Sequence, residues 1–285
     1  MSPRIDPPTN ATGDPLTTLS HNGMTTKIIQ LSDFHLLKVA DEELRGVPTA
    51  ACLADVLAFV REKSADADLF IMTGDIAAHG EAAAYELAGE LCRDLLPRSV
   101  MIPGNHDDAD LMRRIFPELV PGDTGPVGFS REIGGWRLIG LDTHVAGEVA
   151  GKLSREQLVA LSKKLSVHAE QPTLIFMHHP PISVGSAWLD RIMLRNADDL
   201  AALLASAPQV RGIFCGHVHQ EYSGMLGKIP VFTAPATAIQ FAPGKEELEF
   251  DDIPPGFRVI ELFGDEFQTQ ILRLPELKFR ATPNS

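Results

Sequence analysis

Five short apolar segments of the chain each end abruptly in residues that commonly bind metals, and this repeated layout constrains the fold more than any other feature. The five segments are Leu31-Ser32-Asp33-Phe34-His35, Met72-Thr73-Gly74-Asp75, Ile102-Pro103-Gly104-Asn105-His106-Asp107, Phe176-Met177-His178-His179 and Cys215-Gly216-His217-Val218-His219. In open α/β sheets, ligands bind at the carboxyl ends of the strands. We therefore expect these polar residues to converge on one crevice, where glycines 74, 104 and 216 allow the backbone to turn sharply or to approach an ion.

Short apolar runs alternate with stretches of helical period along most of the chain. The runs predict strands at 27–32, 68–73, 99–102, 136–141, 173–177 and 211–215. Apolar residues at helical spacing predict helices around 53–60 and 85–95. Ser154-Arg155-Glu156-Gln157 has the form of a capping box that opens a further helix, and Asn196 is placed to cap another. This alternation predicts βαβ units in a mainly parallel, buried sheet.

The last third of the chain has a different pattern. The pattern predicts antiparallel hairpins at 221–234 and 257–274. Between them, residues 241–256 are rich in Pro, Gly and acidic residues, which predicts a long loop. The hairpins imply a second sheet. We therefore predict an α/β fold of two packed β-sheets flanked by helices, which is a four-layer αββα sandwich.

The ends of the domain follow from composition. Residues 1–24 are rich in Pro, Thr, Ser, Asn and Gly and have no hydrophobic period, which predicts a disordered tail before a domain at 25–285. A second interpretation is that translation starts at Met24, because the first strand begins almost immediately after it. The N-terminus also lacks the basic and then apolar pattern of a secretory signal.

Charge and cysteine content exclude several classes of protein. The formal net charge of −13 argues against binding a nucleic-acid polymer or a membrane surface, which needs a basic face. No apolar run approaches the roughly 20 residues needed to cross a bilayer. Three widely spaced cysteines, Cys52, Cys92 and Cys215, form no CxxC pair, so a disulfide framework or thiolate metal site is not expected. A reduced, cytoplasmic location is the better interpretation.

The donor types in the five segments indicate the chemistry. Imidazoles and carboxylates without thiolates suit Mn, Fe, Zn or Co. Two ions about 3.5–4 Å apart are the usual arrangement for hydrolysis of phosphate esters, and one carboxylate must then bridge them. Each motif alone is weak evidence, because Gly-Asp at a strand end is a common turn. All five in this order, each after a strand, form a strong signal.

At this point the chain resembles the calcineurin-like metallophosphoesterases, whose pattern is D-x-H, GD, GNHD or GNHE, H, and GHxH, over about residues 27 to 275. The closer likeness is to the bacterial class III cyclic nucleotide phosphodiesterases, and it is carried by Gly140-Leu141-Asp142-Thr143, His178-His179-Pro180-Pro181, Ala187-Trp188-Leu189-Asp190 and Leu194-Arg195-Asn196-Ala197-Asp198. The glycerophosphodiesterases of the same fold share much of this.

The resemblance implies a role for each matching residue. The first metal would be held by Asp33, His35 and His219, the second by Asn105, His178 and His217, and Asp75 would bridge the two. Iron and manganese are favoured. Asn105, His106 and His219 would face the substrate, and His106 would protonate the leaving group while a water shared by the ions attacks the phosphorus. Because dimers are common in this family, the resemblance also implies a homodimer for this chain.

One position departs from the family pattern. Related phosphatases carry an acidic residue three positions after the bridging aspartate, where it orients the catalytic histidine, and here that position is Ala78. Either another group, such as the adjacent Asp107, orients His106, or His106 is a weaker acid. The absence of the arginine that follows this acid in protein phosphatases disfavours phosphoprotein substrates.

The neighbouring residues allow simpler interpretations. His179 follows a ligand on a strand and is expected to be structural, and Phe34 is expected to pack in the core rather than against a nucleobase. Asp142 is placed to support the ligands. His79 and His144 are expected to be solvated loop residues.

Several functions stay open at this level. The leading hypothesis is hydrolysis of a small phosphodiester, with 3′,5′-cyclic AMP as substrate. A glycerophosphodiester, a 2′,3′-cyclic nucleotide or another phosphodiester are alternatives, because specificity lies in loops that the motifs do not define. A non-catalytic interaction module is a remote alternative, because such a protein is free to lose ligands and none is missing here.

Overall fold

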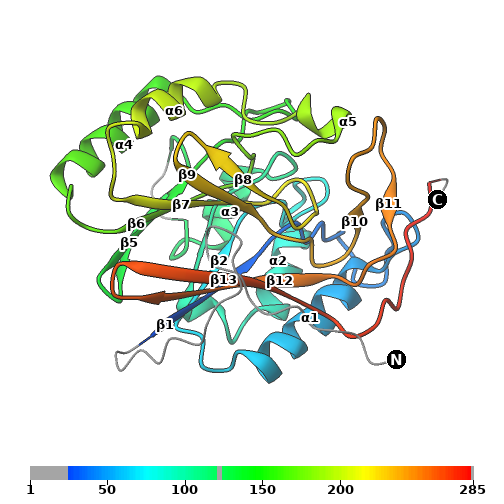
Figure 1. Ribbon diagram of the computed structural model, residues 1–285. Coiled ribbons are helices and arrows are strands. Elements are labelled where there is room, and N and C mark those ends of the chain that lie inside the picture. The colour runs from blue at the N-terminus through cyan, green and yellow to red at the C-terminus, as the bar shows by residue number, and fades with distance from the viewer. Residues whose placement is uncertain (1–24, 121–123, 284–285) are drawn as a thin grey trace, which may run out of the picture.

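The apolar runs that precede the predicted ligands form strands, and these strands divide between two sheets (Figure 1). The computed structural model describes residues 25–120 and 124–283. The first sheet has the order β13-β12-β1-β2-β3, with β1 at Thr26–Leu31, β2 at Leu69–Met72, β3 at Ser99–Met101, β12 at Gly256–Phe263 and β13 at Glu266–Arg273. The second has the order β4-β5-β6-β7-β9-β8, with β4 at Phe129–Ile133, β5 at Trp136–Leu141, β6 at Thr173–Met177, β7 at Val210–Cys215, β8 at Ser223–Leu226 and β9 at Ile229–Thr233.

The central strands of each sheet are parallel. Strands β1, β2 and β3 run in the same direction in the first sheet, as do β5, β6, β7 and β9 in the second. Antiparallel pairs β12–β13 and β4–β5 lie at sheet edges, and β8 pairs antiparallel with β9. The carboxyl ends of β1, β2 and β3 therefore lie at one edge of their sheet, and those of β6 and β7 at one edge of theirs.

A layer of apolar side chains joins the two sheets. Residues of alternate parity face it, so Ile28 of β1 lies in this layer while Ile29 faces the helices on the other side. Phe176, Phe214 and Phe232 come from the neighbouring strands β6, β7 and β9, and their rings stack at centroid separations of 5.3 Å. These stacked rings of the second sheet form part of the apolar layer between the sheets.

Helices cover the outer face of each sheet (Figure 1). Helices α1 (Thr49–Lys63), α2 (Ala82–Leu91) and α3 (Ala109–Ile115) pack on the first sheet, and α4 (Arg155–Val167) and α6 (Ala197–Leu204) pack on the second. The remaining helices are the short α5 (Ala187–Asp190) and the 3₁₀ turn η1 (Leu96–Arg98). The capping box at Ser154 is present and begins α4. Asn196 precedes α6, but its side chain bonds both backbone groups of Leu153 instead of capping the helix.

The structure confirms the predicted fold class and corrects some details. The parallel strands do not form one sheet with the hairpins in another, because each sheet combines parallel strands with an antiparallel pair. The segment predicted as a loop at 241–256 carries two short paired strands, β10 (Gln240–Phe241) and β11 (Phe250–Asp251). Strand β4 and helices α3 and α5 were not predicted.

The termini add little to this picture. The predicted tail at residues 1–24 and the alternative start at Met24 lie outside the described residues. Among the helices of the described part, none has both the length and the apolar character needed to span a bilayer.

Candidate metal centre

The predicted ligands lie at the carboxyl ends of five strands, where the two sheets meet. Asp33 and His35 follow β1, Asp75 follows β2 and Asn105 follows β3, all in the first sheet. The other three, His178, His217 and His219, follow β6 and β7 in the second sheet. Six of the seven are buried and Asn105 is half-buried. The expectation that these segments converge is confirmed.

The backbone turns sharply at most of these residues. Five of the seven have positive φ, namely Asp33 (57°), His35 (47°), Asp75 (53°), His217 (72°) and His219 (49°). A left-handed backbone is uncommon for residues other than glycine and costs of order 1–3 kcal/mol each. Here the left-handed backbone turns the chain so that the first and third side chains of the D-x-H motif, and those of the H-x-H motif, face the same site. The middle residues, Phe34 and Val218, are then fully buried in apolar clusters.

Two glycines permit this packing. Gly74 has φ of +93°, which suits the turn before Asp75. A Cβ at Gly104 would lie 2.2 Å from Oδ1 of Asp75, so only glycine allows the third strand end to approach the second. The sharp turn that the sequence predicted is confirmed at Gly74, whereas Gly104 allows a close approach to Asp75.

Asp33, His35 and His219 form the first group of donors. Nε2 of His35 lies 3.0 Å from Nε2 of His219, which in turn lies 3.4 Å from Oδ1 of Asp33. Nδ1 of His219 donates to the carbonyl of Ile239 at 2.8 Å, so its Nε2 is the free lone-pair nitrogen. Two atoms bound to one ion at about 2.1 Å and at right angles would lie about 3 Å apart, so these separations suit a shared cation.

Asn105, His178 and His217 form the second group. Oδ1 of Asn105 lies 3.3 Å from Nε2 of His178, whose Nδ1 donates to the carbonyl of Thr73 at 2.7 Å. Among the described residues, Nε2 of His217 is buried and has no hydrogen-bond partner. A buried polar atom without a partner costs about 1–3 kcal/mol, and coordination of a cation would satisfy it.

Asp75 connects the two groups through one oxygen. Oδ2 of Asp75 lies 3.5 Å from Nε2 of His35 in the first group and 3.3 Å from Nε2 of His178 in the second. Its other oxygen, Oδ1, accepts the backbone N–H of His106 at 2.9 Å. One carboxylate is therefore placed to contact a cation on each side, as a bridging ligand must be.

Burial and charge set the protonation of these groups. Burial would raise the pKa of Asp75, but the charge and hydrogen bond of His178 outweigh it and hold the pKa well below its usual range. Burial alone would lower the pKa of His178, but its attraction to Asp75 dominates and raises the pKa to about 9. Burial lowers the pKa of His35 and that of His217 to about 3 in each case. An ionised Asp75 and neutral His35 and His217 are the forms that bind metal ions, whereas His178 would have to lose its proton when a metal binds.

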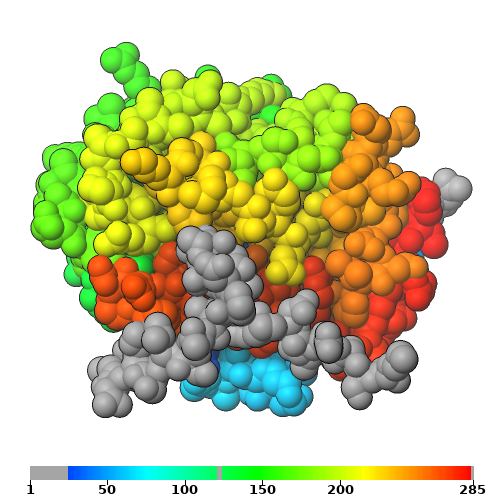
Figure 2. Space-filling view, in the orientation of Figure 1, coloured from blue at the N-terminus to red at the C-terminus, as the bar shows by residue number. Residues whose placement is uncertain are grey.

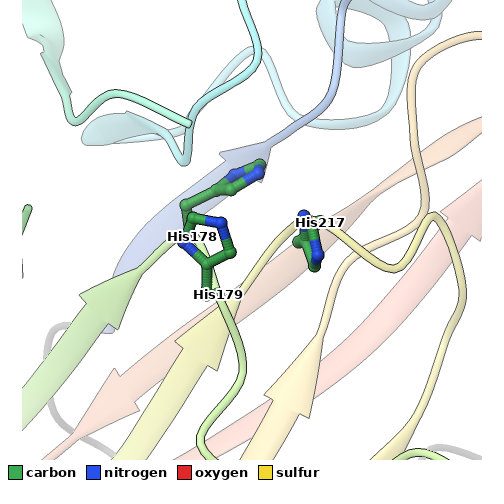
Figure 3. Close-up of side chains that lie close together, drawn as sticks. All are labelled: His178, His179 and His217. Atoms are coloured by element: carbon green, nitrogen blue, oxygen red, sulfur yellow. The ribbon is translucent and has the colours of Figure 1, made fainter. Parts of the chain in front are cut away.

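His179 lies against this centre without belonging to it. Figure 3 shows its ring beside those of His178 and His217, and the His179 and His217 ring centroids are 4.6 Å apart. Its Nδ1 is 2.7 Å from Oγ1 of Thr143 and its Nε2 donates to the carbonyl of Val149 at 2.9 Å. Because both ring nitrogens have protein partners, we assign His179 a structural role, but its ring lies against those of His178 and His217 and does not point away from the proposed metals as the sequence predicted.

His106 lies exposed beside the two groups, and a backbone carbonyl orients it. Its Nδ1 donates to the carbonyl of Ala78 at 2.8 Å. The suggestion that Asp107 orients His106 is wrong. The buried Asp107 carboxylate instead accepts hydrogen bonds from the N–H groups of residues 76, 77 and 104 and from the hydroxyl of Tyr85. Burial, together with the charge of Asp75, raises the pKa of Asp107 to about 6.

Other predicted positions are also corrected. Asp142 accepts the backbone N–H groups of Val127 and His144 and contacts no metal-binding side chain, so it stabilises a loop rather than the ligands. That loop borders a hollow of about 1000 Å³ beside Asn105, lined also by Lys152. Tyr85 was predicted only as part of the apolar face of a helix, and its hydrogen bond to Asp107 was not expected. The backbone carbonyls that orient the histidine rings were not predicted either.

Comparison with known proteins agrees with this geometry. Residues 26–221 match the family model described as Calcineurin-like phosphoesterase. The chain is 35% identical to the 3′,5′-cyclic adenosine monophosphate phosphodiesterase CpdA of Vibrio vulnificus, over 92% of this chain and 94% of the relative. It is 32% identical to a "Probable glycerophosphodiester phosphodiesterase GpdQ" of Arcobacter nitrofigilis, over 75% and 80%.

Solved structures show the same fold at lower identity. A dimetal phosphatase from Danio rerio superposes with a TM-score of 0.55 at 14% identity, over 87% of this chain and 98% of that one. The extent of the family match and the identity to curated relatives agree with the motifs and the strand-end geometry. This chain belongs to the calcineurin-like phosphoesterase family.

Proposed function

We propose that this chain is a phosphodiesterase that uses two metal ions to hydrolyse 3′,5′-cyclic AMP. The observation that carries the proposal is the position of Asp75 Oδ2, within 3.5 Å of an imidazole nitrogen from each donor group. The relative at 35% identity, whose printed name is that of a cyclic AMP phosphodiesterase, supports this substrate.

The donor set fits a pair of ions. The first would be held by Asp33, His35 and His219, the second by Asn105, His178 and His217, with Asp75 shared. Nitrogen and oxygen donors suit Mn, Fe, Zn or Co, and we favour iron and manganese. Such a pair would acidify a water and stabilise the negative charge that develops on the phosphate.

The protein itself supplies orientation and a proton. Asn105 and His106 border the exposed side of the centre, so we place them against the phosphate. With Nδ1 held by the carbonyl of Ala78, the Nε2 of a protonated His106 is free to give its proton to the leaving oxygen. His219 is only 4% exposed, so we assign it to the metal rather than to the substrate.

A glycerophosphodiester is the second candidate substrate. The similarity to the GpdQ relative supports it, and the hollow of about 1000 Å³ beside Asn105 has room for leaving groups of different size.

Location and assembly are also part of the proposal. The three buried free cysteines suit a reducing cytoplasm, and the homodimer stays a prediction that sedimentation would test.

Metal analysis combined with a substrate panel tests the proposal. We expect about two ions per chain and the highest kcat/KM for 3′,5′-cyclic AMP among that compound, 2′,3′-cyclic AMP, glycerophosphocholine and bis(p-nitrophenyl) phosphate. An Asp75→Asn variant serves as the control and should lose both metal and activity. If the wild-type protein hydrolyses none of the four compounds with Mn²⁺ present, the proposal of a phosphodiesterase is refuted, and the alternative of a non-catalytic interaction module is favoured.

A further inference from the structure

An aromatic ring outside the predicted ligand set lies flat on one of the ligands. The ring of Phe241, in β10, is stacked on the imidazole of His219 with a centroid separation of 4.0 Å and an interplanar angle of 9°. Among the ring pairs recorded in the described residues, this one has the shortest separation and the smallest angle. The sequence predicted this segment as part of a loop and assigned Phe241 no role.

Two residues of one segment, Ile239 and Phe241, hold His219 in place. The carbonyl of Ile239 accepts Nδ1–H of His219 at 2.8 Å, and the backbone N–H of Phe241 donates to the His219 carbonyl at 3.4 Å. The Phe241 ring covers one face of the imidazole. A single hydrogen bond at Nδ1 leaves the ring free to rock about that bond, whereas a flat contact on its face removes this freedom. Nε2 is thereby aimed at Asp33 Oδ1, 3.4 Å away.

Phe241 is itself supported from a second element. The ring of Trp188, in α5, meets it edge-on with centroids 5.1 Å apart and an angle of 72°. The backbone N–H of Gly244 donates to Oγ of Ser186, at the start of the same helix. Figure 2 shows the orange β10–β11 segment lying against the light-green segment that contains α5. The ring that stacks on His219 is therefore also held by a contact from α5.

We propose that Phe241 is a positioning residue that fixes the plane of the His219 imidazole and so sets the affinity of the first metal site. The inference rests on the proposed function, since it takes His219 as a ligand. Groups behind a metal ligand orient it, and their loss typically weakens metal binding by 10–100-fold. A cation on Nε2 would also make the imidazole more positive, which strengthens its attraction to the face of an aromatic ring.

Calorimetric titration of the metal-free protein with Mn²⁺ tests the inference without any measurement of activity. We expect Phe241→Leu to weaken one of the two binding steps by roughly 10–100-fold and to leave the other unchanged. Phe241→Tyr keeps the flat ring and should bind as the wild type does. The matched control is Phe250→Leu, because Phe250 pairs with Phe241 across the two strands but packs on Phe241 rather than on His219.

The outcomes separate this inference from the proposed function. Wild-type affinity at both sites in Phe241→Leu overturns it. An equal loss in Phe241→Leu and Phe250→Leu also overturns it, because the effect then belongs to the stability of the strand pair, which thermal unfolding of the metal-free variants would register. A wild-type protein that binds two ions but cleaves no phosphodiester refutes the proposed function and leaves the role of Phe241 to be decided by the same titrations.

Discussion

Replacing His106 by alanine tests the role of that residue as a proton donor. In the described part of the chain, the His106 ring has one recorded hydrogen-bond partner, the Ala78 carbonyl at 2.8 Å from Nδ1; it also meets the ring of His35 edge-on with centroids 4.8 Å apart, and the residue is exposed. The His106 backbone N–H, which donates to Oδ1 of Asp75 at 2.9 Å, is unaffected by the substitution. The bridging carboxylate should therefore stay in place, and we expect about two metal ions per chain in the variant.

The expected loss follows from what the ring supplies. A placed acid typically contributes about 10²–10⁴ in rate, and this corresponds to roughly 3–5 kcal/mol in the activation barrier. The alkoxide that leaves a cyclic nucleotide needs a proton, whereas p-nitrophenolate leaves without one. We therefore expect kcat for cyclic AMP to fall by about 10²–10⁴ in His106→Ala and that for bis(p-nitrophenyl) phosphate to fall far less.

The assay compares kcat for the two substrates at matched metal content. His79→Ala is the control, because His79 is an exposed histidine next to Ala78 and we expect it to be a solvated loop residue. It should behave as the wild type with both substrates. Equal losses for the two substrates in His106→Ala would refute the reasoning, since the residue would then act on the phosphate rather than on the leaving group.

Three further predictions concern the metal centre and the cysteines. Gly104→Ala places a Cβ 2.2 Å from Oδ1 of Asp75, so we expect roughly 10–100-fold weaker metal binding or activity, measured by metal analysis and turnover. In the metal-free protein, burial lowers the pKa of His178, but the attraction of Asp75 outweighs burial and raises that pKa to about 9. A metal must displace the proton, so metal affinity should rise with pH up to about 9 and level off above it, which titrations at several pH values would show. Burial raises the pKa of Cys52 and that of Cys92 to about 12, so neither should react with iodoacetamide near neutral pH in the folded protein, as intact mass would show.

Much of the centre could be predicted because its parts are local. Each ligand directly follows an apolar strand, so a short window of sequence contains both the strand and the donor. The carboxyl ends of parallel strands lie at one edge of a sheet, which brought the segments together without knowledge of strand order. The capping box of α4 was predictable for the same reason, since the two hydrogen bonds that form it join Ser154 and Gln157, which are three positions apart.

The parts that were missed depend on contacts between distant segments. Whether β9 pairs with β7 or with another strand is decided by packing, and the hairpin pattern at 221–234 fits either arrangement. The group that orients His106 is a backbone carbonyl, which any residue at position 78 would provide, so no side-chain pattern could reveal it. Strands β10 and β11 have two residues each, which is too short for any periodicity.

The proposed ligands of each donor group come from both sheets, and metal binding there would couple folding to metal supply. Asp33 and His219 share the first group although 186 positions separate them in the sequence, and Asn105 and His178 share the second. An ion held there would add a further link between two sheets that already meet at this edge through apolar contacts and through hydrogen bonds such as that from Nδ1 of His178 to the carbonyl of Thr73. The free energy of each binding event would then add to the free energy of unfolding. In a cell short of these metals the protein would be less stable as well as less active, and proteolysis would degrade the metal-free form faster than the metal-bound form.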